Sequence, residues 1–230
     1  RASTNRSRAG PKEQRTLFGI LILATLLRFQ GMFGESLDHL EVSYLPGIGR
    51  PSPFAEGTSG FAAVPRMLGE MAELYCLDLV HPPLYHLILG IMRLFGSADW
   101  LLRLPGLIAS LWTCWLLWKF MRRWGGSVGL LTAFLYAIAG PSTYFGQDAT
   151  PYAAVGLVAV ASVVTMVQAL ERGRNRDWAV YFTVITIGFF CHYNLAILGV
   201  AELLTLLGLT WVGRADRRWP ASQRPPRRRA

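Results

Sequence analysis

Long apolar segments alternate with short basic turns along most of the chain. A membrane-spanning helix needs roughly 20 mostly apolar residues, and six stretches meet or approach that length: 16–33, 100–121, 127–145, 152–170, 178–191 and 195–212. This pattern predicts an all-α fold, a polytopic transmembrane helical bundle with about six spans. A further apolar run at 84–95 is too short to count as a span.

Basic residues mark one side of the predicted bundle. The tendency of Lys and Arg to gather in cytoplasmic segments places four parts of the chain inside the cell: residues 1–15, the turn 119–123, the turn 172–176 and the tail from 214. An even number of crossings must then separate the first two. We therefore interpret 81–96 as a helix lying on the outer face, within one long external loop of residues 34–99.

Two further patterns agree with this topology. The apolar spacing in 61–77 is typical of a second amphipathic helix on the bilayer surface. Nine of the fourteen acidic residues fall on the predicted outer side, although they were not used to build the topology: Glu35, Asp38, Glu41, Glu56, Glu70, Glu73, Asp78, Asp99 and Asp148.

Composition favours the bilayer over other partners. Apolar residues make up 52% of the chain and charged residues 16%, a balance that is unusual for a soluble domain. The net charge of +9 would suggest nucleic-acid binding in a soluble protein, but here the arginines lie at span ends, so membrane orientation explains them and no nucleic-acid partner is expected. Cys76, Cys114 and Cys191 form neither a disulfide framework nor a metal-binding spacing.

The organisation expected from these patterns has three parts. A basic cytoplasmic tail spans 1–15, a transmembrane module spans 16–213, and a basic, disordered tail spans 214–230. We expect an uncleaved first span, a cytoplasmic N-terminus and a location in the plasma (inner) membrane. The start at Arg1 and the arginine-rich end favour a fragment of a longer protein.

An acidic cluster just outside the first span is the first candidate for chemistry. It contains Glu35, Asp38, His39 and Glu41. Asp38 and Glu41 are three residues apart and would share a helix face, where one carboxylate can raise the pKa of the other. Such a carboxylate could serve as a general base toward an acceptor hydroxyl or amine. The alternative is that these acids only mark the water interface.

A second candidate opens the predicted outer-face helix with the sequence HPPLYH. Its prolines suit a first helical turn, and His81 lies near Tyr85 and His86 at helical spacing. Imidazoles beside a helix N-terminus could hold a phosphate. The alternative is a set of interfacial side chains without a ligand.

Two external turns and one intramembrane acid complete the candidates. The turn 144–152 contains Gln147 and Asp148 ahead of Pro151, and the turn after Cys191 contains His192. The first can be read as an ordinary polar turn, and a lone histidine such as His192 is usually structural. Glu202 lies inside the last span, where a carboxylate is costly enough to indicate a buried partner or a site.

The order of these motifs resembles the GT-C superfamily of polyprenyl-phosphate-sugar-dependent glycosyltransferases, in particular bacterial members similar to dolichyl-phosphate-mannose protein mannosyltransferases (family 39/83 type). The motifs are the acidic segment after the first span, HPPLYH followed by Phe95-Gly96, then LRLPG at 102–106, then GQDATPYA, then CHYN. The resemblance runs from Thr16 to about Trp211, which would be the amino-terminal module of such an enzyme.

The resemblance implies a lipid-phosphate sugar donor on the outer face and an inverting transfer to a lipid, glycan or protein acceptor. It implies that Glu41 or Asp38 is the catalytic base, with His81 and Arg103 as candidates to meet the phosphate. The donor and acceptor sites would be lined by His81, Tyr85, His86, Arg103, Gln147, Asp148, Tyr152 and His192. It indicates no certain cofactor; it leaves room for a divalent metal, but no pattern points to one.

One departure from the family pattern concerns the catalytic base. Relatives usually carry adjacent Asp and Glu in the first loop, whereas this chain has Leu40-Glu41. Two alternatives to an active transferase therefore stay open. A transporter predicts polar residues along the spans, and a catalytically degenerate family member predicts no role for Asp38 or Glu41.

Overall fold

The described part of the protein is entirely helical. The computed structural model describes residues 9–33, 69, 82–96 and 98–218. Within those ranges no strand occurs, and the helices are α1 (Pro11–Met32), α4 (Pro83–Phe95), α5 (Asp99–Met121), α6 (Gly126–Ile138), α7 (Gly140–Phe145), α8 (Tyr152–Arg172), α9 (Asn175–Cys191) and α10 (Leu195–Arg218), with a 3-10 turn at Arg122–Trp124. The predicted all-α membrane bundle is confirmed.

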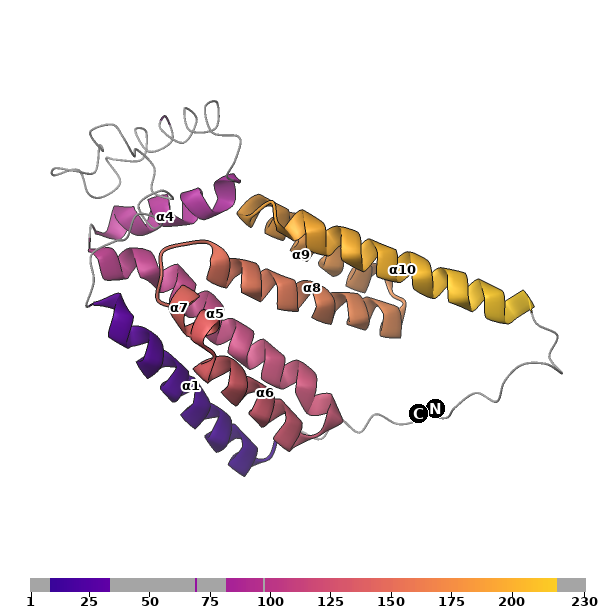
Figure 1. The fold of residues 1–230 in the computed structure, drawn as a ribbon, viewed down its shortest axis with the longest axis horizontal. Coiled ribbons are helices and arrows are strands. Elements are labelled where there is room, and N and C mark those ends of the chain that lie inside the picture. The colour runs from indigo at the N-terminus through magenta and orange to yellow at the C-terminus, as the bar shows by residue number, and fades with distance from the viewer. Residues whose placement is uncertain (1–8, 34–68, 70–81, 97, 219–230) are drawn as a thin grey trace.

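The long helices run back and forth between two ends of the bundle (Figure 1). α1 packs against α5 and α6, α5 packs against α8, and α9 and α10 complete the far side. α4 lies at the end where α1 and α9 finish and where α5, α8 and α10 begin, and it contacts α5 and α9. The helix predicted at 81–96 is therefore present as α4, whereas its position on a bilayer surface stays a prediction.

Three of the described helices are long and apolar enough to cross a membrane, namely Pro11–Met32, Asp99–Trp124 and Tyr152–Arg172. Shorter apolar helices occupy Gly126–Ile138 and Leu195–Trp211. The antiparallel course of the helices fits six crossings, but that count stays a prediction for α6 with α7, for α9 and for α10.

Several predicted boundaries shift. α1 begins at Pro11 rather than at residue 16, and α9 begins at Asn175 rather than at 178. α10 continues to Arg218, past the predicted end at 212, so the first residues of the predicted tail are helical. The amphipathic helix predicted at 61–77 lies, except for Gly69, outside the described residues.

The prediction of one continuous span at 127–145 is wrong. The segment is two helices, α6 and α7, separated at Ala139, whose backbone is extended (φ −65°, ψ 128°). Pro141 explains the break, because in a continuous helix its ring would collide with the carbonyl of Ala137 and it has no N–H to donate. The break leaves carbonyl groups near the middle of the bundle that need other hydrogen-bond donors.

The first core cluster joins α1, α5 and α6 through both large and small side chains. Its buried members are Leu17, Ile20, Ala24, Cys114, Trp118, Ala133 and Ala137. Small residues allow helix backbones to approach closely, which is the usual way helices pack in lipid. Large apolar side chains such as Phe18, Leu131 and Leu204 are instead exposed on the outside of the bundle, as expected for surfaces that face lipid.

Glu202 has buried partners and holds α10 to the bundle. Its carboxylate accepts a hydrogen bond from Ser162 Oγ of α8 (2.8 Å) and one from Tyr181 Oη of α9 (3.0 Å). All three residues are buried. Because α10 is otherwise largely exposed, this polar cluster is its most specific attachment to the other helices, and the buried-partner interpretation of Glu202 is the one the structure supports.

We expect Tyr181→Phe and Ser162→Ala each to destabilise the protein by about 1–3 kcal/mol, because each leaves the buried carboxylate without one donor. The apparent midpoint of thermal unfolding in detergent, followed by circular dichroism, measures the effect. Thr205→Ala is the matched control, since Thr205 is exposed on α10 and bonds only to the carbonyl of Ala201 in its own helix. Equal midpoints for all three variants would contradict the role given to Glu202.

Candidate functional site

Most of the predicted site residues lie at one end of the bundle. The end of α1, α4, the start of α5, the loop 146–151 and the end of α9 all meet there (Figure 1). The described candidates on these elements are Tyr85, His86, Arg103, Gln147, Asp148, Tyr152 and His192. Asp38, Glu41 and His81 lie outside the described residues, so their predicted roles stay predictions.

The loop 146–151 is wedged between α1 and α5 at two glycines. A Cβ on Gly106 would lie 2.6 Å from the backbone oxygen of Asp148, and a Cβ on Gly31 would collide with the side chain of Gln147. At Gly106 only hydrogen fits, because the obstacle is backbone, whereas at Gly31 it is the far end of a flexible side chain. The glycine of the LRLPG motif is therefore needed for the loop to reach its position.

Asp148 is buried inside this loop rather than pointing into solvent. It is 6% exposed, and its Oδ2 accepts a hydrogen bond from Thr150 Oγ1 at 2.9 Å. Thr150 is itself fully buried. The pair fixes the shape of the loop just before α8 starts.

Tyr85 connects α4 to the same loop. It is 1% exposed and forms a cluster with Leu89, Leu102 and Ala149, all of which are fully buried. Its neighbour His86 is also buried. The tyrosine of HPPLYH thus packs between α4, α5 and the loop, and the leucine of LRLPG completes the contact.

Arg103 binds the end of α1. Its Nη1 donates to the carbonyl oxygens of Met32 (3.1 Å) and Gly31 (3.3 Å), and the residue is 3% exposed. The last carbonyls of a helix lack donors within the helix and carry partial negative charge, so a guanidinium there is stabilising. Arg103 therefore fixes the point at which the chain leaves α1 toward the acidic cluster.

Tyr152 and His192 lie side by side where α8 begins and α9 ends. Their ring centroids are 5.6 Å apart, and Tyr152 also packs against Phe145, with centroids 4.8 Å apart. His192 Nδ1 accepts a hydrogen bond from the backbone N–H of Asn194 at 3.1 Å. The structure thus brings together the GQDATPYA and CHYN motifs.

Sequence reasoning missed Arg28, which lies in the interior beneath the loop. It is completely buried, and its guanidinium donates to Ser110 Oγ (2.8 Å), to the carbonyl oxygens of Ala24 (2.9 Å) and Ala137 (3.1 Å), and to both the carbonyl oxygen and Oγ of Ser142 (3.2 Å each). These five hydrogen bonds equal the number of N–H donors that a guanidinium carries.

Arg28 is thus the donor that the break at Ala139 requires. Its partners Ala137 and Ser142 flank the break, and Ser142 Oγ also bonds to the carbonyl oxygens of Tyr136 and Ala139. In the part of the chain that the structure describes, no carboxylate pairs with Arg28. A charged residue inside an apolar span was the available signal, but only the fold shows what it contacts.

The opposite end of the bundle carries the basic turns. Glu13 of α1 accepts hydrogen bonds from Trp118 Nε1 and Arg122 Nε, both at 3.1 Å. Arg123 pairs with Glu171 at the end of α8, with Nη1 2.7 Å from Oε1. The arginines predicted to be cytoplasmic and the described candidate site residues are therefore separated by the length of the spans.

The described residues form no metal site. Among the residues that the structure describes, no group of three His, Cys, Asp or Glu side chains could hold a metal ion. The acidic cluster at 35–41 lies outside that set.

Comparison with known proteins decides the family. A model of the dolichyl-phosphate-mannose-protein mannosyltransferase family matches residues 80–221, more than half of the chain. The chain belongs to this family. The match confirms the predicted resemblance and supports a membrane glycosyltransferase of the mannosyltransferase type, and it covers every described site residue except those of α1. Searches of curated proteins and of solved structures returned no match.

We expect Gly106→Ala to destabilise the protein by about 1–3 kcal/mol, because the added methyl group must displace the backbone of the loop at Asp148. Gly31→Ala should cost less, since the side chain of Gln147 can rotate away. Gly156→Ala in α8 is the control: nothing lies within 4 Å of its Cβ position, and alanine is the better helix former. Thermal unfolding in detergent measures all three. An unfolding midpoint for Gly106→Ala at or above that of the control would contradict the close packing of the loop against Gly106.

Arg28→Lys tests the five hydrogen bonds. Lysine keeps the charge but has three donors instead of five, so carbonyl groups at the helix break lose their partners, at a cost of about 1–3 kcal/mol for each buried group. We expect a clear fall in the unfolding midpoint, with little change for Arg123→Lys, where the arginine is exposed. Equal midpoints would show that the break needs only a positive charge.

Proposed function

We propose that the protein transfers a sugar from a polyprenyl-phosphate donor to an acceptor on the outer face of the plasma membrane. The family match carries this proposal. The gathering of the described candidate residues at one end of the bundle, with the basic turns at the other, supports the location on the outer side.

The proposed reaction needs one base and one leaving group. A carboxylate, Glu41 or Asp38, takes the proton of the acceptor hydroxyl, whose oxygen attacks the anomeric carbon of the sugar from the side opposite the phosphate. The bond between the anomeric carbon and the phosphate oxygen breaks, and polyprenyl phosphate leaves with the electron pair. The configuration at the anomeric carbon is inverted.

Buried positive charge favours the phosphate of the donor at this end of the bundle. Arg103 and Arg28 are both buried near the end of α1, where little water screens them. Nη1 of Arg103 donates to α1, and the five donors of Arg28 are used within the bundle. These donors therefore do not bind the phosphate directly, and the two arginines attract it through the electrostatic field of their charges. His81, at the entry to α4, is the proposed direct partner.

The loop 146–151 and the aromatic pair shape the proposed pocket. Asp148 and Thr150 hold the loop, and Tyr152 and His192 supply ring faces and polar atoms at the start of α8 and the end of α9. Aromatic surfaces of this kind suit a sugar ring or the isoprenoid chain next to it. Tyr85 fixes α4 against the loop, and His86 is buried next to it in α4.

The transporter alternative loses its strongest argument. It needs intramembrane polar groups that face a substrate path. The buried charged groups described in the spans contact structural partners: Arg28 the helix break, Arg103 the end of α1, and Glu202 the side chains of Ser162 and Tyr181. They hold helices together.

We expect membranes containing the protein to transfer radiolabelled mannose from polyprenyl-phosphate mannose to endogenous acceptors. The Asp38→Ala, Glu41→Ala double variant should lower the rate by roughly 10²- to 10⁴-fold, the usual contribution of a general base. Glu171→Gln is the matched control, because this carboxylate lies at the opposite end of α8; its rate should match the unmodified protein.

Undiminished transfer by the double variant would refute the assignment of the base and leave the class intact. Absence of transfer from mannose, other hexose and pentose donors alike would instead support a catalytically degenerate member of the family.

A further inference from the structure

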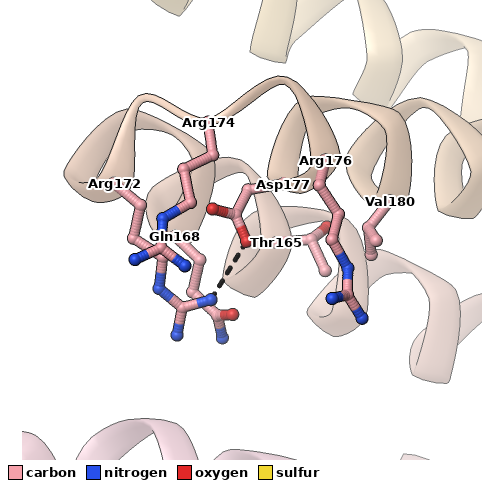
Figure 2. Close-up of a pocket in the computed structure, with 7 residues that line it drawn as sticks. All are labelled: Thr165, Gln168, Arg172, Arg174, Arg176, Asp177 and Val180. Atoms are coloured by element: carbon pink, nitrogen blue, oxygen red, sulfur yellow. Dashed lines mark hydrogen bonds and ion pairs between the residues drawn. The ribbon is translucent and has the colours of Figure 1, made fainter.

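A basic pocket lies between the end of α8 and the start of α9, far from the candidate site. It has a volume of about 350 Å³ and is lined by Thr165, Gln168, Arg172, Arg174, Arg176 and Asp177. Figure 2 shows the three arginine side chains directed to the same side of the turn, with Gln168 and Thr165 between them. The pocket has the size of a small ligand site.

The turn that builds the pocket is well defined. α8 ends at Gly173, whose left-handed backbone (φ 65°, ψ 19°) lets its N–H bond back to the carbonyl of Ala169 at 2.8 Å. This cap stops the helix at once. α9 then starts at Asn175, and the short connection brings Arg172, Arg174 and Arg176 into one small volume.

The charge of the pocket is not balanced by its own residues. Three guanidinium groups and one carboxylate line it, which leaves two positive charges. Asp177 Oδ1 is 3.1 Å from Nη1 of Arg172, so this carboxylate forms an ion pair with Arg172. The nearby carboxylate of Glu171 pairs with Arg123 instead. Arg174 and Arg176 are exposed, and in Figure 2 they extend from the turn on either side of Asp177.

The pocket is separate from the proposed donor site. α8 has 21 residues, so its two ends are about 30 Å apart at 1.5 Å per residue. Tyr152 of the candidate site is at one end, and Arg172 is at the other. The pocket also borders the ends of apolar helices, which is the depth at which lipid headgroups meet a membrane protein.

We propose that this pocket binds a phosphate group, and specifically the phosphate of an anionic lipid headgroup on the membrane face opposite the candidate active site. Arginine is the residue best suited to this ligand, because its planar fork donates two parallel hydrogen bonds to phosphate oxygens. Gln168 and Thr165 supply neutral donors. General attraction of basic turns to an anionic surface would need neither the cavity nor these polar groups.

Lipid binding to the purified protein in a neutral detergent tests the proposal, with native mass spectrometry as the measurement. The probes are phosphatidylglycerol, zwitterionic phosphatidylcholine, and inorganic phosphate as a competitor. We expect phosphatidylglycerol to bind at least tenfold more tightly than phosphatidylcholine. The Arg174→Gln, Arg176→Gln double variant should lose at least tenfold in affinity.

Arg123→Gln is the matched control for Arg174→Gln, because each removes one exposed arginine at the same end of the bundle and only Arg174 lines the pocket. A loss for Arg174→Gln with less than a twofold change for Arg123→Gln supports the pocket. Displacement of the lipid by millimolar phosphate would support the phosphate site and identify a soluble anion as a competing source. Equal losses for the two single variants, or no preference for phosphatidylglycerol, would overturn the proposal.

All the substituted side chains are at the surface, so we expect the helices to stay intact in each variant. Circular dichroism checks this. The readout is binding alone, so its result does not depend on whether the protein transfers sugar.

Discussion

The hydrogen bonds of Arg28 are the interaction on which the arrangement of the bundle depends. A helix broken inside an apolar bundle exposes backbone carbonyls where no water can reach them. Pro141 forces such a break between α6 and α7, and Arg28 from α1 supplies the donors. The hydrogen bonds between Arg28 and these carbonyl groups offset both the cost of burying the guanidinium and the cost of breaking the helix.

The break also positions the candidate site. α7 leads directly into the loop 146–151, whose path is limited by Gly31 on α1 and Gly106 on α5. A straight helix through 127–145 would carry the GQDATPYA motif to a different place. Tyr85 fastens the start of α4 to the loop, and Arg103 fastens the end of α1 to α5. The end of α1 is therefore held at a fixed point of the bundle.

The two ends of the bundle have different electrostatic character. At one end, buried arginines lie beneath a loop that contains a buried aspartate; at the other, exposed arginines outnumber the acids that pair with them. An enzyme that takes a phosphate-linked donor at one face gains from buried positive charge there. The exposed positive charge at the other end includes the three arginines that line the pocket between α8 and α9.

Apolar length and the placement of arginine determined the membrane class and the helical fold, because in lipid only a helix satisfies every backbone group from within one short segment. The order of motifs was enough to predict the family. Sequence could not show that Arg28 and Glu202 hold helices together, because their partners on other helices are distant along the chain. Ser142 lies 114 residues from Arg28, and Ser162 and Tyr181 lie 40 and 21 residues from Glu202. Only the tertiary structure decided that the predicted span 127–145 is broken. A proline alone does not predict a break, because α5 continues through Pro105. At Pro141 the helix is broken, and an arginine from another helix stabilises the break.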